Sequence, residues 1–198
     1  MADSSQDKLS KLAAHWNKIE ARLKEAEQFR EESVTAAINE MRYAGRRIID
    51  VLQELETTGW AQSDKVDEDL IVAKNYLINA DHDITDGICF FAHRRLRRVL
   101  EHHGRAKVER YCSDFVSLFP DIIKAQEIIR GSREDRTSRM NEYENLATNY
   151  LPIIMELHNN IRETYELHLP DDIPSRLDIL QRYVRSVGWL RFWGRLPV

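Results

Sequence analysis

Apolar residues recur every three or four positions along most of the chain, which is the spacing of one face of an α-helix. Two regular series occupy the first third of the sequence, with alternating steps of three and four residues, as in the seam of a coiled coil. The first series is Leu9, Leu12, Trp16, Ile19, Leu23 and Ala26, and the second is Val34, Ala37, Met41, Ala44, Ile48, Val51 and Leu55. We therefore predict a long coiled-coil-like helix with its seam over residues 5–56.

The two series do not share a phase. Ala26 and Val34 are eight residues apart, one more than a heptad. One extra residue turns the apolar face by about 100°. Because no Gly or Pro lies between them, the sequence favours one continuous helix that changes the face it presents. A break at residues 30–33, with Ser33 as the cap of a new helix, is the alternative.

Residues 64–103 are expected to form the central helix of the protein. Acidic residues gather at its start and arginines near its end, and both complement the helix dipole. Ala73, Ala80 and Gly87 recur seven positions apart on one side, so a neighbouring helix can approach closely there. Gly104 is suited to ending the helix.

The rest of the sequence predicts shorter helices that Gly and Pro separate. One covers residues 105–119, and the next runs from Pro120 to Gly131, since proline is favoured in the first turn of a helix. A third covers residues 133–167. It is expected to kink at Pro152, which cannot donate a backbone hydrogen bond.

Together these elements predict an all-α protein built as an elongated bundle of five or six helices. A chain of 198 residues is long enough for one sizeable domain of this kind. We expect the bundle to span residues 1–170. Residues 171–198 are expected to form a C-terminal helix and a tail rich in aromatic residues and arginine.

Composition narrows the classes of function. The net charge of −4 argues against a surface committed throughout to nucleic acid. Cys89 and Cys112 lack metal-site spacing, which indicates neither a zinc site nor a disulfide framework and favours a reducing compartment. No apolar run is long enough to span a membrane, and the N-terminus lacks the apolar core of a leader. A cytoplasmic protein is the expectation.

The stretch from Asp81 to His93 contains the residues most suggestive of chemistry, with Asp83 and Asp86 between them. On a helix His82 and Asp86 share a face. However, no His follows a Glu at the spacing of a di-metal carboxylate bundle, and the two cysteines lie among apolar neighbours, where a thiol is inert. We therefore predict no catalytic residue, no metal and no cofactor, and a solvated polar face or salt-bridged side chains here.

A basic cluster lies at the end of the same predicted helix. We expect its charges mainly to compensate the helix dipole and to pair internally with Glu31 and Glu32 or with the acids at 64–69. The alternative is that the cluster contacts an anionic partner, with nucleic acid possible but not favoured. The residues of the cluster are Arg94, Arg95, Arg97, Arg98, His102 and His103.

Two Arg and His pairs resemble a motif of HEPN-type ribonucleases, small helical enzymes in which a His follows an Arg after a short fixed spacing. The pairs are Arg98 with His103 and Arg162 with His168. The resemblance implies an RNA-binding protein or a ribonuclease that works through these residues. The polar residue expected beside the Arg is not evident in either pair.

Two further surfaces point to partners. The narrow N-terminal seam is flanked by charge, as in helices that a partner helix covers, so we predict a homodimer through Leu9, Leu12, Trp16, Ile19 and Leu23. The tail carries Trp189, Arg191, Phe192, Trp193 and Arg195, residue types that suit a protein interface or a membrane surface. The predicted function is that of a non-enzymatic interaction or assembly protein that associates with itself, with membrane-surface binding as the third reading.

Overall fold

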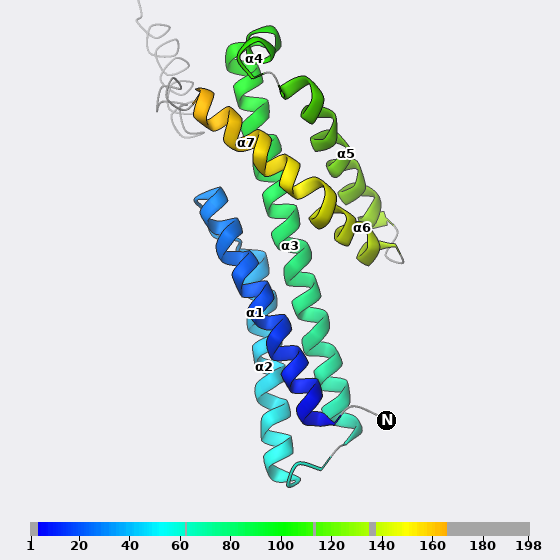
Figure 1. Ribbon diagram of the computed structural model, residues 1–198. Helices are drawn as coiled ribbons and strands as arrows, with labels where there is room; N and C mark the ends of the chain where they lie inside the picture. The colour runs from blue at the N-terminus through cyan, green and yellow to red at the C-terminus, as the bar shows by residue number, and fades with distance from the viewer. Residues whose placement is uncertain (1–3, 62, 113, 135–137, 166–198) are drawn as a thin grey trace, which may run out of the picture.

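The computed structural model describes residues 4–61, 63–112, 114–134 and 138–165 (Figure 1). All regular structure within these residues is helical, and no strand is present among them. The elements are α1 (Ser5–Arg30), α2 (Thr35–Thr57), α3 (Asp64–His103), α4 (Arg105–Tyr111), α5 (Phe115–Glu134), α6 (Arg139–Asn145), the π-helix η1 (Leu146–Tyr150) and α7 (Leu151–Tyr165). The predicted all-α fold is confirmed.

Helix α3 is the central helix, and α1, α2, α4, α5 and α7 all contact it. Figure 1 shows α1 and α2 beside its N-terminal half, and α5 with the α6–α7 segment beside its C-terminal half. Helix α6, η1 and α7 follow one another without a break, so the described residues form six helical rods. The central helix that the sequence predicted at residues 64–103 lies where it was expected.

The prediction of one continuous N-terminal helix is wrong. Helix α1 ends at Arg30, and Glu31 adopts a left-handed conformation with φ 56°. Helix α2 then begins after Val34, and no side chain caps its first turn, so Ser33 does not act as a cap. The phase slip between the two apolar series therefore marks a reversal of the chain, which lets both helices pack their seams against α3.

The small residues of α3 perform the packing role that their spacing predicted. Ala73 and Ala80 are fully buried in the core. At Gly87, an added Cβ would lie 3.0 Å from Nη1 of Arg30 and 3.5 Å from Cγ1 of Val34. The glycine thus leaves room for the guanidinium group of Arg30 at the point where α1 ends.

The break that was predicted at Pro120 lies earlier in the chain. Helix α4 ends at Tyr111, and α5 begins at Phe115 and contains Pro120. Phe115 is fully buried, and its ring stacks on that of Phe119 with the centroids 5.1 Å apart. Burial of these two rings offsets the one backbone hydrogen bond that the proline cannot donate.

Two other predicted boundaries differ. Helix α5 passes through Gly131 and ends at Glu134, and the helix predicted from residue 133 begins at Arg139 in the structure. The irregularity expected at Pro152 takes the form of the π-helical turn η1 directly before it, in which the N–H of Leu151 donates to the carbonyl of Leu146. A π turn is a common way to accommodate such a disruption.

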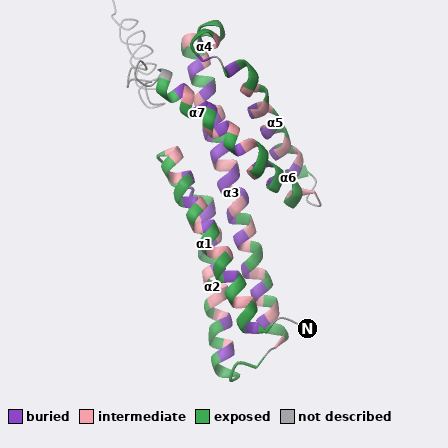
Figure 2. Cartoon of the chain, viewed as in Figure 1, coloured by how far each residue is buried: buried purple, intermediate pink, exposed green. Residues whose placement is uncertain are grey.

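The N-terminal seam faces the protein's own core. Leu12, Ile19 and Leu23 are buried, while Leu9 and Trp16 are half-buried and pack against the same cluster. Figure 2 shows buried positions along α3, whose N-terminal half lies beside α1 and α2. The seam therefore does not need a partner helix to bury it, which removes the reason for which a homodimer was predicted.

Candidate anion-binding cleft

Three arginines of the predicted basic cluster line one cleft. It has a volume of about 390 Å³ and lies where the end of α1 meets the C-terminal half of α3. Its lining residues are Arg30, Glu31 and Glu32 from the end of α1, and Phe91, Arg94, Arg95, Arg98 and Val99 from α3.

The local sequence explains why these residues converge. Phe91, Arg95 and Arg98 follow one another at steps of four and three residues, so they share one face of α3. The left-handed conformation of Glu31 ends α1 opposite that face. The two glutamates that follow α1 are thereby held against the arginines. The cleft depends on the helix break that sequence analysis did not favour.

Ion pairs cross the cleft from three helices. Glu32 lies 3.5 Å from Nη2 of Arg30 and 3.8 Å from Nη2 of Arg94. On the other side, Nη2 of Arg162 from α7 lies 3.2 Å from Glu31. The expected pairing with Glu31 and Glu32 is therefore present.

Arginines outnumber glutamates around the cleft. Arg30, Arg94, Arg95 and Arg98 line it together with Glu31 and Glu32, and Arg162 reaches Glu31 from α7. The side chains of Glu31 and Glu32 are more than half exposed, and exposed ion pairs contribute little to stability. An incoming anion can therefore replace the glutamates at low cost.

The electrostatics of the cleft favour an anion. Burial lowers the pKa of Arg95; Glu31 opposes that shift, and the neighbouring charges of Arg162 and Arg98 add to it. Arginine nevertheless stays protonated in proteins. The cleft thus holds mutually repelling positive charges in a fixed arrangement, and a bound anion would relieve the repulsion.

A buried histidine packs against this arrangement. The ring of His158 from α7 lies 4.4 Å from that of Phe29 and 5.5 Å from that of Phe91, between ring centroids. It is 5% exposed. Burial lowers the pKa of His158 to about 4, and the charges of Arg95 and Arg162 add to that effect while Asn159 opposes it. His158 is therefore a neutral ring that links α1, α3 and α7.

The other members of the predicted cluster lie outside the cleft. Nε of Arg97 donates to Oε1 of Glu101 at 2.8 Å. His102 and His103 form a T-shaped contact at the end of α3, with their centroids 4.6 Å apart. The predicted six-residue surface is therefore divided, and only Arg94, Arg95 and Arg98 converge.

The Arg and His pairs of the ribonuclease alternative are not brought together in the described residues. Arg98 lines the cleft whereas His103 does not, since five positions along a helix correspond to a rotation of roughly 140°. Arg162 contacts the cleft through its ion pair with Glu31. Its proposed partner His168 lies outside the described residues.

Of the two expectations for the stretch from Asp81 to His93, a solvated face or salt-bridged side chains, the structure shows salt bridges at Asp81 and Asp86. Oδ1 of Asp86 accepts a hydrogen bond from the hydroxyl of Tyr143 at 2.6 Å, and Oδ2 accepts one from Arg133 at 2.7 Å. Asp81 pairs with Arg22 of α1. These carboxylates connect α3 to α5, α6 and α1, so they serve tertiary packing.

His82 belongs to the same buried region. Its ring stacks on that of Tyr143 with the centroids 4.0 Å apart. Burial lowers its pKa to about 4, with a further contribution from Arg139. Among the described residues, no group of three or more His, Cys, Asp or Glu side chains is placed to hold a metal ion.

Burial also raises the pKa of Cys89 to about 12, so this thiol is a poor nucleophile at neutral pH. No helix among the described residues is long and apolar enough to cross a membrane. The predicted C-terminal helix and the tail residues Trp189, Arg191, Phe192, Trp193 and Arg195 lie outside the described residues.

The described residues define an all-helical fold with a cleft lined by four arginines between the end of α1 and α3. Comparison with family models, with curated proteins and with solved structures finds no match to this chain. Sequence analysis missed Arg30 and His158, and it considered Arg162 only as a partner of His168; these residues reach the site from α1 and α7. The phase slip between the two apolar series was the signal that could have found Arg30. A chain reversal at that slip brings Arg30 to α3.

Proposed function

We propose that this protein is a non-enzymatic interaction protein that holds an acidic segment of a partner protein in the cleft between α1, α3 and α7. The observation that carries the proposal is that four arginines line one cleft with two exposed glutamates, while a fifth arginine, Arg162, pairs with Glu31. Guanidinium groups bind carboxylates through two parallel hydrogen bonds. Side-chain carboxylates of a partner can take the place of Glu31 and Glu32.

The shape of the cleft favours a peptide segment over a nucleic acid. Its volume of about 390 Å³ suits one or two acidic side chains. A nucleic-acid site normally extends as a stripe of positive charge, whereas here the net charge of the chain is −4.

The test measures binding of a fluorescent glutamate-rich peptide to the full chain by anisotropy. The double variant Arg94→Glu/Arg98→Glu reverses two charges within the cleft. Each charge-assisted hydrogen bond contributes about 1.5–3 kcal/mol, so we expect affinity to fall at least about tenfold. The matched control is Arg97→Glu, on the same helix but outside the cleft, which should bind as the unchanged protein does.

A second arm uses a single-stranded RNA of similar length and charge. If RNA binds more tightly than the peptide, or is cleaved in a reaction that requires His103, the ribonuclease alternative replaces this proposal. Equal losses in the double variant and in Arg97→Glu would show a diffuse attraction in place of a cleft.

Self-association is a second proposal, and a specific groove supports it. Between α1 and α2 a groove of about 260 Å³ is lined by Leu9, Trp16, Ile48 and Leu52, among other residues. Leu52 is 44% exposed. A second copy of the chain would bury this groove. Mass measurement by light scattering tests it, because Leu52→Glu should convert a dimer to a monomer, and a monomer before any substitution would refute the proposal.

A further inference from the structure

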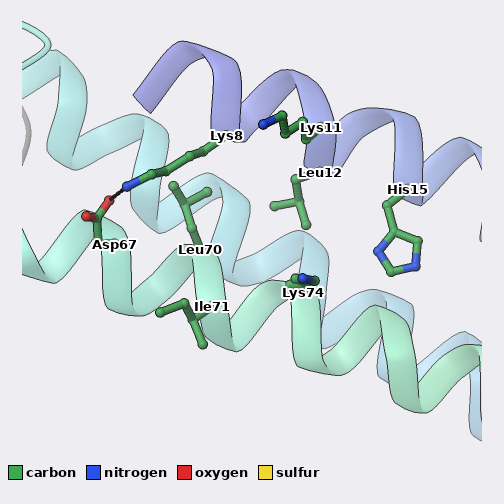
Figure 3. Close-up of a pocket in the computed structure, with 8 residues that line it drawn as sticks. All are labelled: Lys8, Lys11, Leu12, His15, Asp67, Leu70, Ile71 and Lys74. Carbon is green, nitrogen blue, oxygen red and sulfur yellow. Dashed lines mark hydrogen bonds and ion pairs between the residues drawn. The ribbon is translucent and has the colours of Figure 1, made fainter. Parts of the chain in front are cut away.

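A second pocket lies at the opposite end of α1 from the arginine cleft. It has a volume of about 460 Å³ and is bounded by α1 and the first turns of α3 (Figure 3). Its lining residues are Lys8, Lys11, Leu12 and His15 from α1, and Asp67, Leu70, Ile71 and Lys74 from α3. The volume falls within the range of small-molecule sites in proteins.

The floor of this pocket is aliphatic. Leu12 and Leu70 are each 6% exposed and belong to the hydrophobic core. Ile71 forms a wall and is 60% exposed, which is high for a large apolar side chain. No aromatic side chain lines the pocket. The surface left open to a ligand is therefore suited to a hydrocarbon chain.

The rim of the pocket is basic. Nζ of Lys8 pairs with Oδ1 of Asp67 at 2.7 Å and bridges the two helices at one end, as Figure 3 shows. Toward the other end lie His15 on α1 and Lys74 on α3. Burial lowers the pKa of His15, and the charges of Lys18 and Lys74 add to the effect. Positive charge thus exceeds negative charge around an apolar floor.

We propose that this pocket binds an unbranched aliphatic carboxylate, with the hydrocarbon chain on Leu12, Leu70 and Ile71 and the carboxylate beside Lys74. Residues 8–15 of α1 set the length of the pocket at roughly 10 Å, from the rise of 1.5 Å per residue. Lysine is a compact point charge that suits a single carboxylate. No arginine among the lining residues offers the two-pronged geometry that would favour a phosphate diester.

A partner helix fits this pocket less well. A docked helix has a diameter of about 10–12 Å and needs a groove open along its axis. The Lys8–Asp67 pair crosses from α1 to α3 and closes one end. A flexible chain that ends within the pocket avoids this obstruction.

The test is calorimetric titration of the full chain with hexanoate, octanoate and decanoate, each below its micelle concentration. One buried methylene contributes about 0.8 kcal/mol, which corresponds to roughly fourfold in affinity. We expect affinity to rise by about that factor per methylene and to level off when the chain exceeds the pocket. Decylammonium should bind at least about tenfold more weakly than decanoate, because the lysines would repel it.

Two exposed positions give variants that keep the fold. Lys74→Glu should weaken decanoate by about tenfold through charge reversal, and Ile71→Ser should weaken it and flatten the gain per methylene. The matched control is Arg97→Glu, the same charge reversal on the same helix, which should leave decanoate binding unchanged. Circular dichroism of each variant verifies that the helices are intact.

Three results would overturn the proposal: no saturable binding of any of the carboxylates, equal affinities for decanoate and decylammonium, or equal effects of Lys74→Glu and Arg97→Glu. The proposal is independent of the arginine cleft. The variant Arg94→Glu/Arg98→Glu should therefore retain decanoate binding, and its failure to do so would indicate general attraction of anions to the protein.

Discussion

The contact of Asp86 with Tyr143 provides the sharpest test of how α3 is joined to the C-terminal helices. Asp86→Ala removes the acceptor of the Tyr143 hydroxyl, and Tyr143 is only 3% exposed. A buried hydroxyl without a partner costs about 1–3 kcal/mol. Loss of the Arg133 pair adds at most about 1 kcal/mol, because that arginine is 57% exposed. We therefore expect a total loss of about 1–4 kcal/mol.

Urea unfolding followed by circular dichroism measures this loss. With a dependence on urea of about 2 kcal/mol per molar, the midpoint should fall by about 0.5–2 M. Tyr143→Phe alone should cost about 1 kcal/mol, since the hydroxyl and its hydrogen bond are removed together. The double variant should be less destabilised than the sum of the single variants, with a coupling energy of about 1–2 kcal/mol.

The matched control is Asp50→Ala on α2. Asp50 pairs with Arg46 at 3.3 Å and with Arg47 at 3.8 Å, but neither arginine is buried. Its loss should cost less than about 1 kcal/mol. Additive effects of Asp86→Ala and Tyr143→Phe, or equal losses from Asp86→Ala and Asp50→Ala, would show that the buried contact does not join the two halves.

Three other predictions concern single positions. Burial holds the pKa of His158 near 4, below its unfolded value, so between these two pKa values the unfolded chain binds more protons than the folded protein. The free energy of unfolding therefore falls as pH drops from about 6.5 to 4. His158→Phe should make the free energy of unfolding depend less on pH, as measured by urea titrations at several pH values. Burial and Glu40 raise the pKa of Asp83, so its charged form is disfavoured, and Asp83→Asn should stabilise the protein at pH 7 by a few tenths of a kcal/mol. Gly45→Ala should stabilise it by about 0.5–1 kcal/mol, since the new Cβ would lie 3.4 Å from the ring of Trp16, an ordinary contact; a lower melting temperature would contradict this.

The sequence predicts helices well where apolar spacing is regular and ends are marked by charge or glycine. Residues 64–103 meet both conditions and form α3 with those bounds. The turn at residues 31–34 has neither Gly nor Pro, and Glu31 takes a left-handed conformation that is unfavourable for its residue type. Tertiary packing of α1 and α2 against α3 imposes this turn. The only sign of it in the sequence is the phase slip between the two apolar series.

The candidate cleft could be predicted in part. Arg94, Arg95 and Arg98 are neighbours in sequence, and their excess of charge was visible before the fold was known. Arg30 and Arg162 approach them only because three helices meet at one point. Such convergence depends on long-range packing, which spacing along one helix does not describe.

The reversal at Glu31 has a mechanical consequence for α1. This helix of 26 residues carries Lys8 and His15 into the carboxylate pocket near its first turns and holds Arg30 at the arginine cleft at its last turn. A helix of this length behaves as a stiff rod of roughly 40 Å. Helix α1 is therefore a rigid connection between the pocket at its first turns and the arginine cleft at its last turn. It cannot tilt or slide on α3 without changing the shape of both the pocket and the cleft.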